Sequence, residues 1–74
     1  MRKTQVKITT EYIKLDQLLK FSGICENGSN AKVMILDGIV YVNGEVCLMR
    51  GKKIRQGDIV SAKFDGETVE MTVI

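Results

Sequence analysis

The fold of this chain is decided by residues 29–44, SNAKVMILDGIVYVNG. From Ala31, apolar residues recur at i, i+3 and i+4, and Asp37-Gly38 ends this pattern as a helix C-terminus does. Residues 39–42 are then β-branched or aromatic, and Asn43-Gly44 is the turn sequence of a type I′ hairpin. The stretch therefore predicts a helix that leads directly into a β-hairpin.

The rest of the chain predicts a second helix and further strands around this unit. Leucines at helical spacing predict a helix from Ile13 to Phe21. The helix described above, which begins near residue 30, would be capped by Asn27 or Ser29. Alternating or β-rich runs predict strands at Gln5–Thr9, Ile39–Val42, Glu45–Leu48, Asp58–Phe64 and Glu67–Val73, the last two joined by the turn sequence Asp65-Gly66. We therefore expect an α+β fold, with two short helices on a small, mostly antiparallel sheet and an added N-terminal strand at its edge.

Length and composition narrow the class of protein. A chain of 74 residues has room for one core, so we expect a single domain over residues 1–74. No apolar run approaches the roughly 20 residues that span a bilayer, and the first residues lack the hydrophobic segment of a signal peptide. We expect a cytoplasmic protein with no membrane partner. Cys25 and Cys47 are then expected to be free thiols, and a chain without His or Cys-x-x-Cys offers no metal site.

The formal net charge of +2 conceals a local concentration of cations. Arg50, Lys52, Lys53 and Arg55 fall within six residues, with no acidic residue between Glu45 and Asp58. They belong to a mostly polar run from Met49 to Gly57, which predicts a loop held in place by the apolar side chain of Ile54. Such a loop is either a solvated basic surface or a patch that binds anions.

Four segments together resemble a known family. They are KLDQLL at residues 14–19, SNAK at 29–32, GIVYVNGEV at 38–46 and IRQGDIV at 54–60. In this combination and spacing they resemble the αL RNA-binding domain of ribosomal small-subunit protein four, over about residues 13–62. The chain looks most like the small stand-alone bacterial YaaA/YbcJ-like members of that family. Lys14 and Asn30 stand where many members carry an arginine and a second basic residue.

The resemblance implies a non-enzymatic protein that docks on structured RNA, ribosomal or transfer RNA, or on ribosomal particles. In the family, two helices and a basic loop form one positive face. Carried to this sequence, that face comprises Lys14, Ser29, Asn30, Lys32, Arg50, Lys52, Lys53 and Arg55. The residues themselves support it, because a helix N-terminus near Ser29 presents free amides and the loop cations can contact phosphates. Lys14 and Lys32 can equally be solvated positions on the polar faces of helices.

Two other classes of protein remain open. A β-grasp sulfur carrier has a similar hairpin, but it acts through a Gly-Gly C-terminus and this sequence ends Met71-Thr72-Val73-Ile74. A protein adaptor would use the basic surface to bind an acidic partner. We do not expect an enzyme, a cofactor or a small-molecule substrate, because there is no His and Cys47 falls in an apolar predicted strand where a buried thiol is inert. The sequence predicts no oligomeric state.

Overall fold

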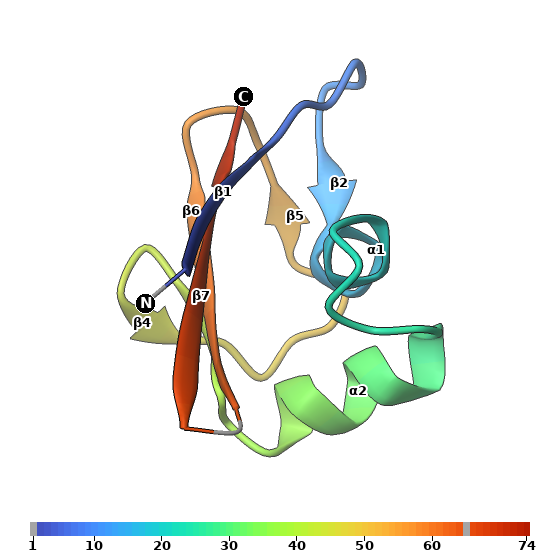
Figure 1. The fold of residues 1–74 in the computed structure, drawn as a ribbon. Helices are drawn as coiled ribbons and strands as arrows, with labels where there is room; N and C mark the ends of the chain where they lie inside the picture. Colours follow the sequence, from blue (N-terminus) through green and yellow to red (C-terminus); the bar gives the residue numbers. More distant parts are fainter. Residues whose placement is uncertain (1, 65) are drawn as a thin grey trace.

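The computed structural model describes residues 2–64 and 66–74, and within them two helices cover one face of a five-stranded sheet (Figure 1). The helices are α1 (Leu15–Phe21) and α2 (Gly28–Leu36). The sheet has the order β1-β7-β6-β3-β4, with β1 at Arg2–Val6, β3 at Val40–Val42, β4 at Glu45–Val46, β6 at Ile59–Phe64 and β7 at Glu67–Val73. A separate ribbon pairs β2 (Ile13–Lys14) with β5 (Lys53–Ile54). The predicted α+β class, two helices on a mostly antiparallel sheet, is confirmed.

The N-terminal strand lies at the sheet edge, as predicted, but its predicted bounds are wrong. The strand is β1, Arg2–Val6, rather than Gln5–Thr9, and it runs parallel to β7. Ile8 then donates its amide to the carbonyl of Ile74 at 2.9 Å, so the chain follows β7 to its end before leaving the sheet. The other strand pairs are antiparallel. Of the predicted Asp65-Gly66 turn between β6 and β7, Asp65 lies outside the described residues.

The predicted hairpin at Asn43-Gly44 is confirmed. Both residues have positive φ, 52° and 88°, and Val42 pairs with Glu45 on either side of the two-residue turn. A type I′ turn requires this backbone conformation, which asparagine and glycine adopt at little cost. The second strand of the hairpin is shorter than predicted, because β4 ends at Val46 instead of Leu48.

The first helix begins two residues later than predicted. Ile13 and Lys14 form β2 in place of the first helical turn, because they pair with Ile54 and Lys53 of β5. This pairing also corrects the prediction of an unbroken loop from Met49 to Gly57. Sequence spacing could not reveal it, since the two strands have two residues each and lie far apart along the chain.

The second helix agrees closely with its prediction. Asn27 is the N-cap, and its side-chain oxygen accepts the Asn30 amide at 3.0 Å. Ala31 and Ile35 are fully buried, and Gly38 follows the helix with φ of 76°. A side-chain cap of this kind satisfies one of the amides that the first turn leaves unpaired.

The core lies between the helix pair and the inner face of the sheet. Helix α1 contributes three fully buried leucines, and Ile54 is fully buried as the sequence predicted. The buried side chains in contact with them include Ala31, Ile35, Val40, Val60, Ala62, Met71 and Val73. Cys25 is a free, buried thiol whose Sγ lies 3.0 Å from the Met34 sulfur, and burial raises the pKa of that thiol. Cys47 is free as well but only half-buried, since it follows β4 rather than lying within a buried strand.

Candidate nucleic-acid interface

The β2–β5 ribbon places two predicted site residues beside each other. Lys14 and Lys53 are register partners in the antiparallel pairing, and both side chains are exposed. Like charges directly opposite each other across two strands are destabilising. A bound anion would remove this repulsion, so the position suits a phosphate group.

The basic loop is attached to the start of α1 by its own backbone. The amide of Leu15 donates to the carbonyl of Lys52 at 2.9 Å, and the amide of Asp16 donates to the carbonyl of Arg50 at 3.1 Å. Loop carbonyls therefore cap the first helix in place of a side chain, while the side chains of Arg50 and Lys52 stay exposed. We call the five exposed cations gathered here the basic cluster: Lys14, Arg50, Lys52, Lys53 and Arg55.

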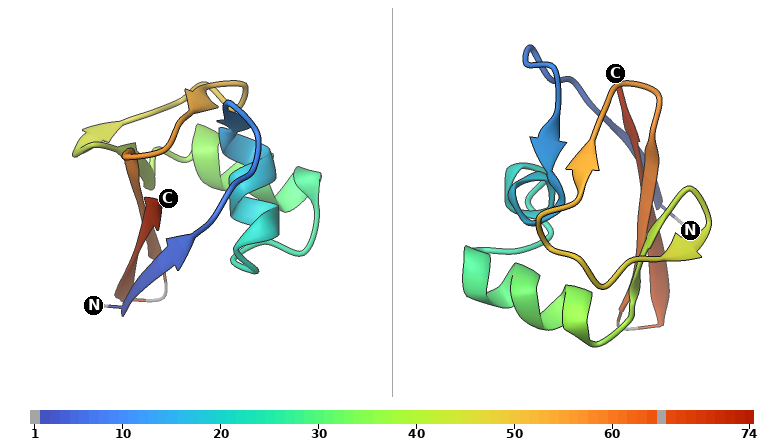
Figure 2. Two further views of the ribbon diagram at one scale, coloured as in Figure 1. Left: turned by 90° about the horizontal axis from the view of Figure 1, so that it is seen from above. Right: turned by 180° about the vertical axis from the view of Figure 1, so that it is seen from behind.

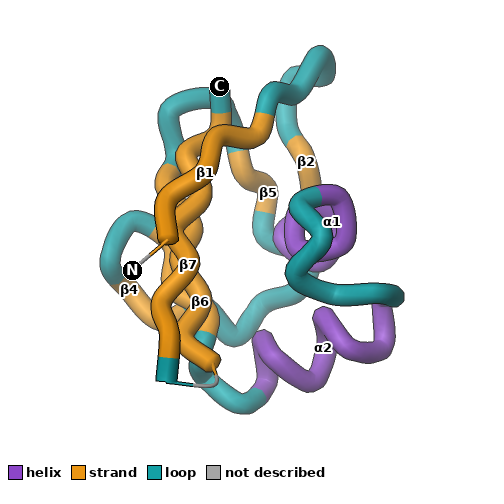
Figure 3. Tube along the Cα trace, viewed as in Figure 1, coloured by secondary structure: helices purple, strands orange, loops and turns teal. Residues whose placement is uncertain are grey.

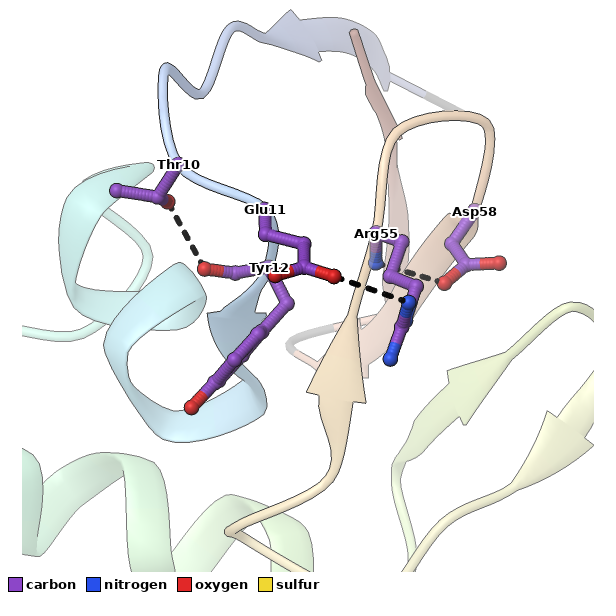
Figure 4. Close-up of polar contacts among 5 residues, drawn as sticks. All are labelled: Thr10, Glu11, Tyr12, Arg55 and Asp58. Carbon is purple, nitrogen blue, oxygen red and sulfur yellow. Dashed lines mark hydrogen bonds and ion pairs between the residues drawn. The ribbon is translucent and has the colours of Figure 1, made fainter.

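A hydrogen-bonded bridge fixes the far end of the basic cluster to the hairpin. Asp58 accepts the backbone amide of Arg55 at 2.9 Å (Figure 4) and the side-chain amide of Asn43 at 3.2 Å. Asn43 in turn accepts the amide of Ile59 at 2.9 Å. The Asn-Gly and Gly-Asp segments of the sequence are thus in direct contact, and Asn43 holds the loop as well as forming the turn.

The same contacts determine the charge state of Asp58. The hydrogen bond from the Arg55 amide is the main cause that lowers the pKa of this carboxyl, with smaller contributions from the Asn43 side chain and the charges of Lys52 and Arg55. Hydrogen bonds and positive charges that favour the ionised form have this effect. Asp58 therefore remains an anionic acceptor at neutral pH.

Two residues that the sequence did not single out lie against the basic cluster. The ring of Tyr12 has the Lys53 ammonium 5.0 Å from its centroid, and Glu11 lies 3.9 Å from the Arg55 guanidinium (Figure 4). Thr10 donates to the carbonyl of Tyr12 at 2.9 Å, within the same segment. No local sequence signal could have identified these contacts, because they follow from the unpredicted β2–β5 pairing.

The predicted site residues on α2 are exposed but only partly adjacent to the basic cluster. The C-terminal end of α2 lies beside the segment that leads from β4 to β5, and its N-terminal end lies at the outer end of the helix pair (Figures 2 and 3). Ser29 and Asn30 belong to the N-terminal turn of α2, and Lys32 follows in the middle of the helix. The Gly28 and Ser29 amides, in the first turn, have no partner within the helix.

Comparison with known proteins identifies the family. Residues 6–72 match the family model of the S4 domain. The chain is 38% identical over 61 residues to the probable ribosome maturation protein RlbA of Bacillus subtilis (strain 168). The aligned residues make up 82% of this chain and 86% of RlbA. It is also 38% identical over 60 residues to YbcJ of Escherichia coli (strain K12), and these residues make up 81% of this chain and 83% of YbcJ.

A solved structure agrees in fold. The solution structure of E. coli YbcJ, described as revealing an αL motif involved in RNA binding, superposes with a TM-score of 0.60 at 30% identity. The match covers 97% of this chain and 87% of YbcJ. The chain belongs to the S4 domain family, in the group of small αL-motif proteins that the sequence resembled. Neither helix in the described part of the chain has the length and apolarity to cross a membrane.

Proposed function

We propose that this protein is a non-enzymatic RNA-binding domain that docks on structured RNA through the basic cluster, with Lys32, Ser29 and Asn30 of α2 extending the contact. The observation that carries the proposal is the gathering of five exposed cations by the β2–β5 ribbon and the capped loop. Cations in this number supply the salt-dependent attraction to phosphates on which nucleic-acid affinity depends. In this proposal, residues 13–62 form the binding core of one domain.

Folded RNA fits the surface better than an extended single strand. Proteins that bind single strands stack successive bases on neighbouring exposed aromatic rings. Tyr12 precedes β2 and Tyr41 lies on β3, and each ring has a lysine ammonium over its face, Lys53 at 5.0 Å and Lys63 at 5.1 Å. A surface rich in cations, whose two tyrosine rings are each covered by a lysine, is suited to reading the phosphate backbone and the shape of the RNA.

Ribosomal RNA is the first candidate ligand, and transfer RNA is the second. The relative from B. subtilis is named for ribosome maturation, and E. coli YbcJ is described as having a motif involved in RNA binding. Both are similar to this chain over most of its length. A ribosomal particle or its precursor is thus the natural place to look for the protein in cells, in the cytoplasm.

A pair of charge-reversal variants tests the face. Lys52→Glu with Arg55→Glu should weaken binding to folded RNA strongly, while thermal unfolding changes little because both side chains are exposed. Arg2→Glu with Lys7→Glu is the matched control, since it replaces one arginine and one lysine, both exposed, and lowers the net charge from +2 to −2 in the same way. Equal RNA affinity in the two double variants would contradict the proposed face. Binding to an acidic protein, with none to RNA, would favour an adaptor.

A further inference from the structure

A groove that shares three cations with the basic cluster has an apolar side and a basic side. The β3–β4 hairpin and the residues after it supply Val46, Leu48 and Met49, and the following segment supplies Lys52, Lys53 and Arg55. The groove has a volume of about 610 Å³. The three apolar side chains are 53%, 56% and 65% exposed. Neighbouring apolar side chains that stay exposed to water are typical of a binding surface.

We propose that this groove holds one unpaired nucleotide of the bound RNA, with its base on Val46, Leu48 and Met49 and its phosphate on the cations. The proposal rests on the proposed function and adds the kind of RNA that is preferred: a folded RNA with a bulged or extruded base. Such a nucleotide has an apolar ring face and an anionic phosphate on one small unit. The groove offers a surface for each part.

The size of the groove agrees with a single nucleotide. Pockets that take drug-sized molecules have volumes of about 300–1,000 Å³, a range that includes this groove. A base inside a helix is stacked and paired, and taking it out costs a few kcal/mol, least where it is already unpaired. A bulge would therefore place its base here at the lowest cost.

The mixed charge of the groove favours a nucleotide over an acidic peptide. Glu45, which is exposed, and Asp58 also line it. The carboxylates of an acidic peptide would be repelled by both. The base of a nucleotide can instead donate hydrogen bonds from its amino groups to the carboxylates, while the phosphate of the nucleotide stays on the side of the cations. Because Lys52, Lys53 and Arg55 belong to the basic cluster, one RNA can occupy the groove and the rest of the cluster together.

The test compares two RNA hairpins that differ only in one unpaired 2-aminopurine in the stem. Fluorescence of this base reports its surroundings, and anisotropy of an end label reports affinity. The variants are Leu48→Ser and Met49→Ser, measured separately. Phe21→Ser is the control, since Phe21 is 67% exposed at the end of α1 and does not line the groove. Thermal unfolding checks that all three remain folded.

We expect wild type to prefer the bulged hairpin and to change the 2-aminopurine signal. Each groove variant should lose about three- to tenfold in affinity for the bulged hairpin, less than the loss of an aromatic stacking partner costs, and nothing for the paired one. Equal affinity for both hairpins, or equal losses on both, would overturn the nucleotide site and leave the proposed function standing. Absence of binding to either hairpin would overturn both the nucleotide site and the proposed function. If an acidic peptide displaced the bound RNA from the groove, the choice of a nucleotide as the occupant would be overturned.

Discussion

Replacing Asn43 by glycine should destabilise the protein although glycine suits the turn. Asn43 has φ of 52°, a conformation that glycine adopts readily, so the backbone of the hairpin is not strained by the change. The substitution removes two side-chain hydrogen bonds, to Asp58 at 3.2 Å and from the Ile59 amide at 2.9 Å. Such bonds each contribute about 0.5–1.5 kcal/mol net, and both lie in exposed surroundings. We expect the free energy of unfolding to fall by about 1–2 kcal/mol.

Thermal unfolding followed by circular dichroism measures this loss. For a domain of this size, 1 kcal/mol lowers the Tm by about 4–8 °C. The matched control is Asn27→Gly, which also removes an asparagine side-chain bond, to the Asn30 amide, at a helix N-cap where glycine costs only a few tenths of a kcal/mol. If Asn43→Gly is no less stable than Asn27→Gly, the bridge does not hold the loop to the hairpin, and the account of the shared Asn-Gly and Gly-Asp segments fails.

Three further predictions follow from single contacts. Glu11→Gln removes an exposed anion 3.9 Å from Arg55 and should tighten RNA binding about twofold, as measured by anisotropy at low salt. Thermal unfolding should show little change in stability. Ile54→Ala should lower the free energy of unfolding by about 2–5 kcal/mol in urea titrations, because this β5 side chain is fully buried in the core. Folding lowers the pKa of Asp58, so the ionised carboxylate stabilises the protein above the ordinary carboxyl pKa of about 3.9, and this stabilisation is lost as the pH falls through the folded value. In urea titrations from pH 6 to pH 2.5, the free energy of unfolding should therefore fall less for Asp58→Asn than for wild type.

The main elements of the fold were predictable because their signals are local. The hairpin turn depends on Asn43-Gly44 alone, and the end of α2 depends on Gly38, whose φ of 76° suits glycine. The pairing of β2 with β5 was not predictable, since a strand of two residues carries no period. Ile13 and Lys14 have the same pattern as the helix that follows, and only their tertiary partners make them a strand.

The candidate site divides in the same way. The cations of residues 50–55 are visible in the sequence, and the resemblance to the S4 domain family adds Lys14 and three residues of α2. Their arrangement depends on backbone bonds from Leu15 and Asp16 to the loop, which no side-chain pattern encodes. The proximity of Tyr12 to Lys53, and the position of the N-terminal end of α2 at the outer end of the helix pair, likewise follow from the tertiary fold.

RNA docking through the basic cluster is tested most directly by the affinity of this protein for a folded RNA hairpin, an unstructured RNA of equal length and a DNA duplex, each across a salt series. We predict that the folded RNA binds most tightly. Its affinity should fall on a log–log plot with a slope of several units, up to about 3.5–4.5 if all five cations of the basic cluster meet phosphates. No binding to any of the three at low salt would contradict the account, and the cluster would then be a solvated surface or a site for an acidic protein.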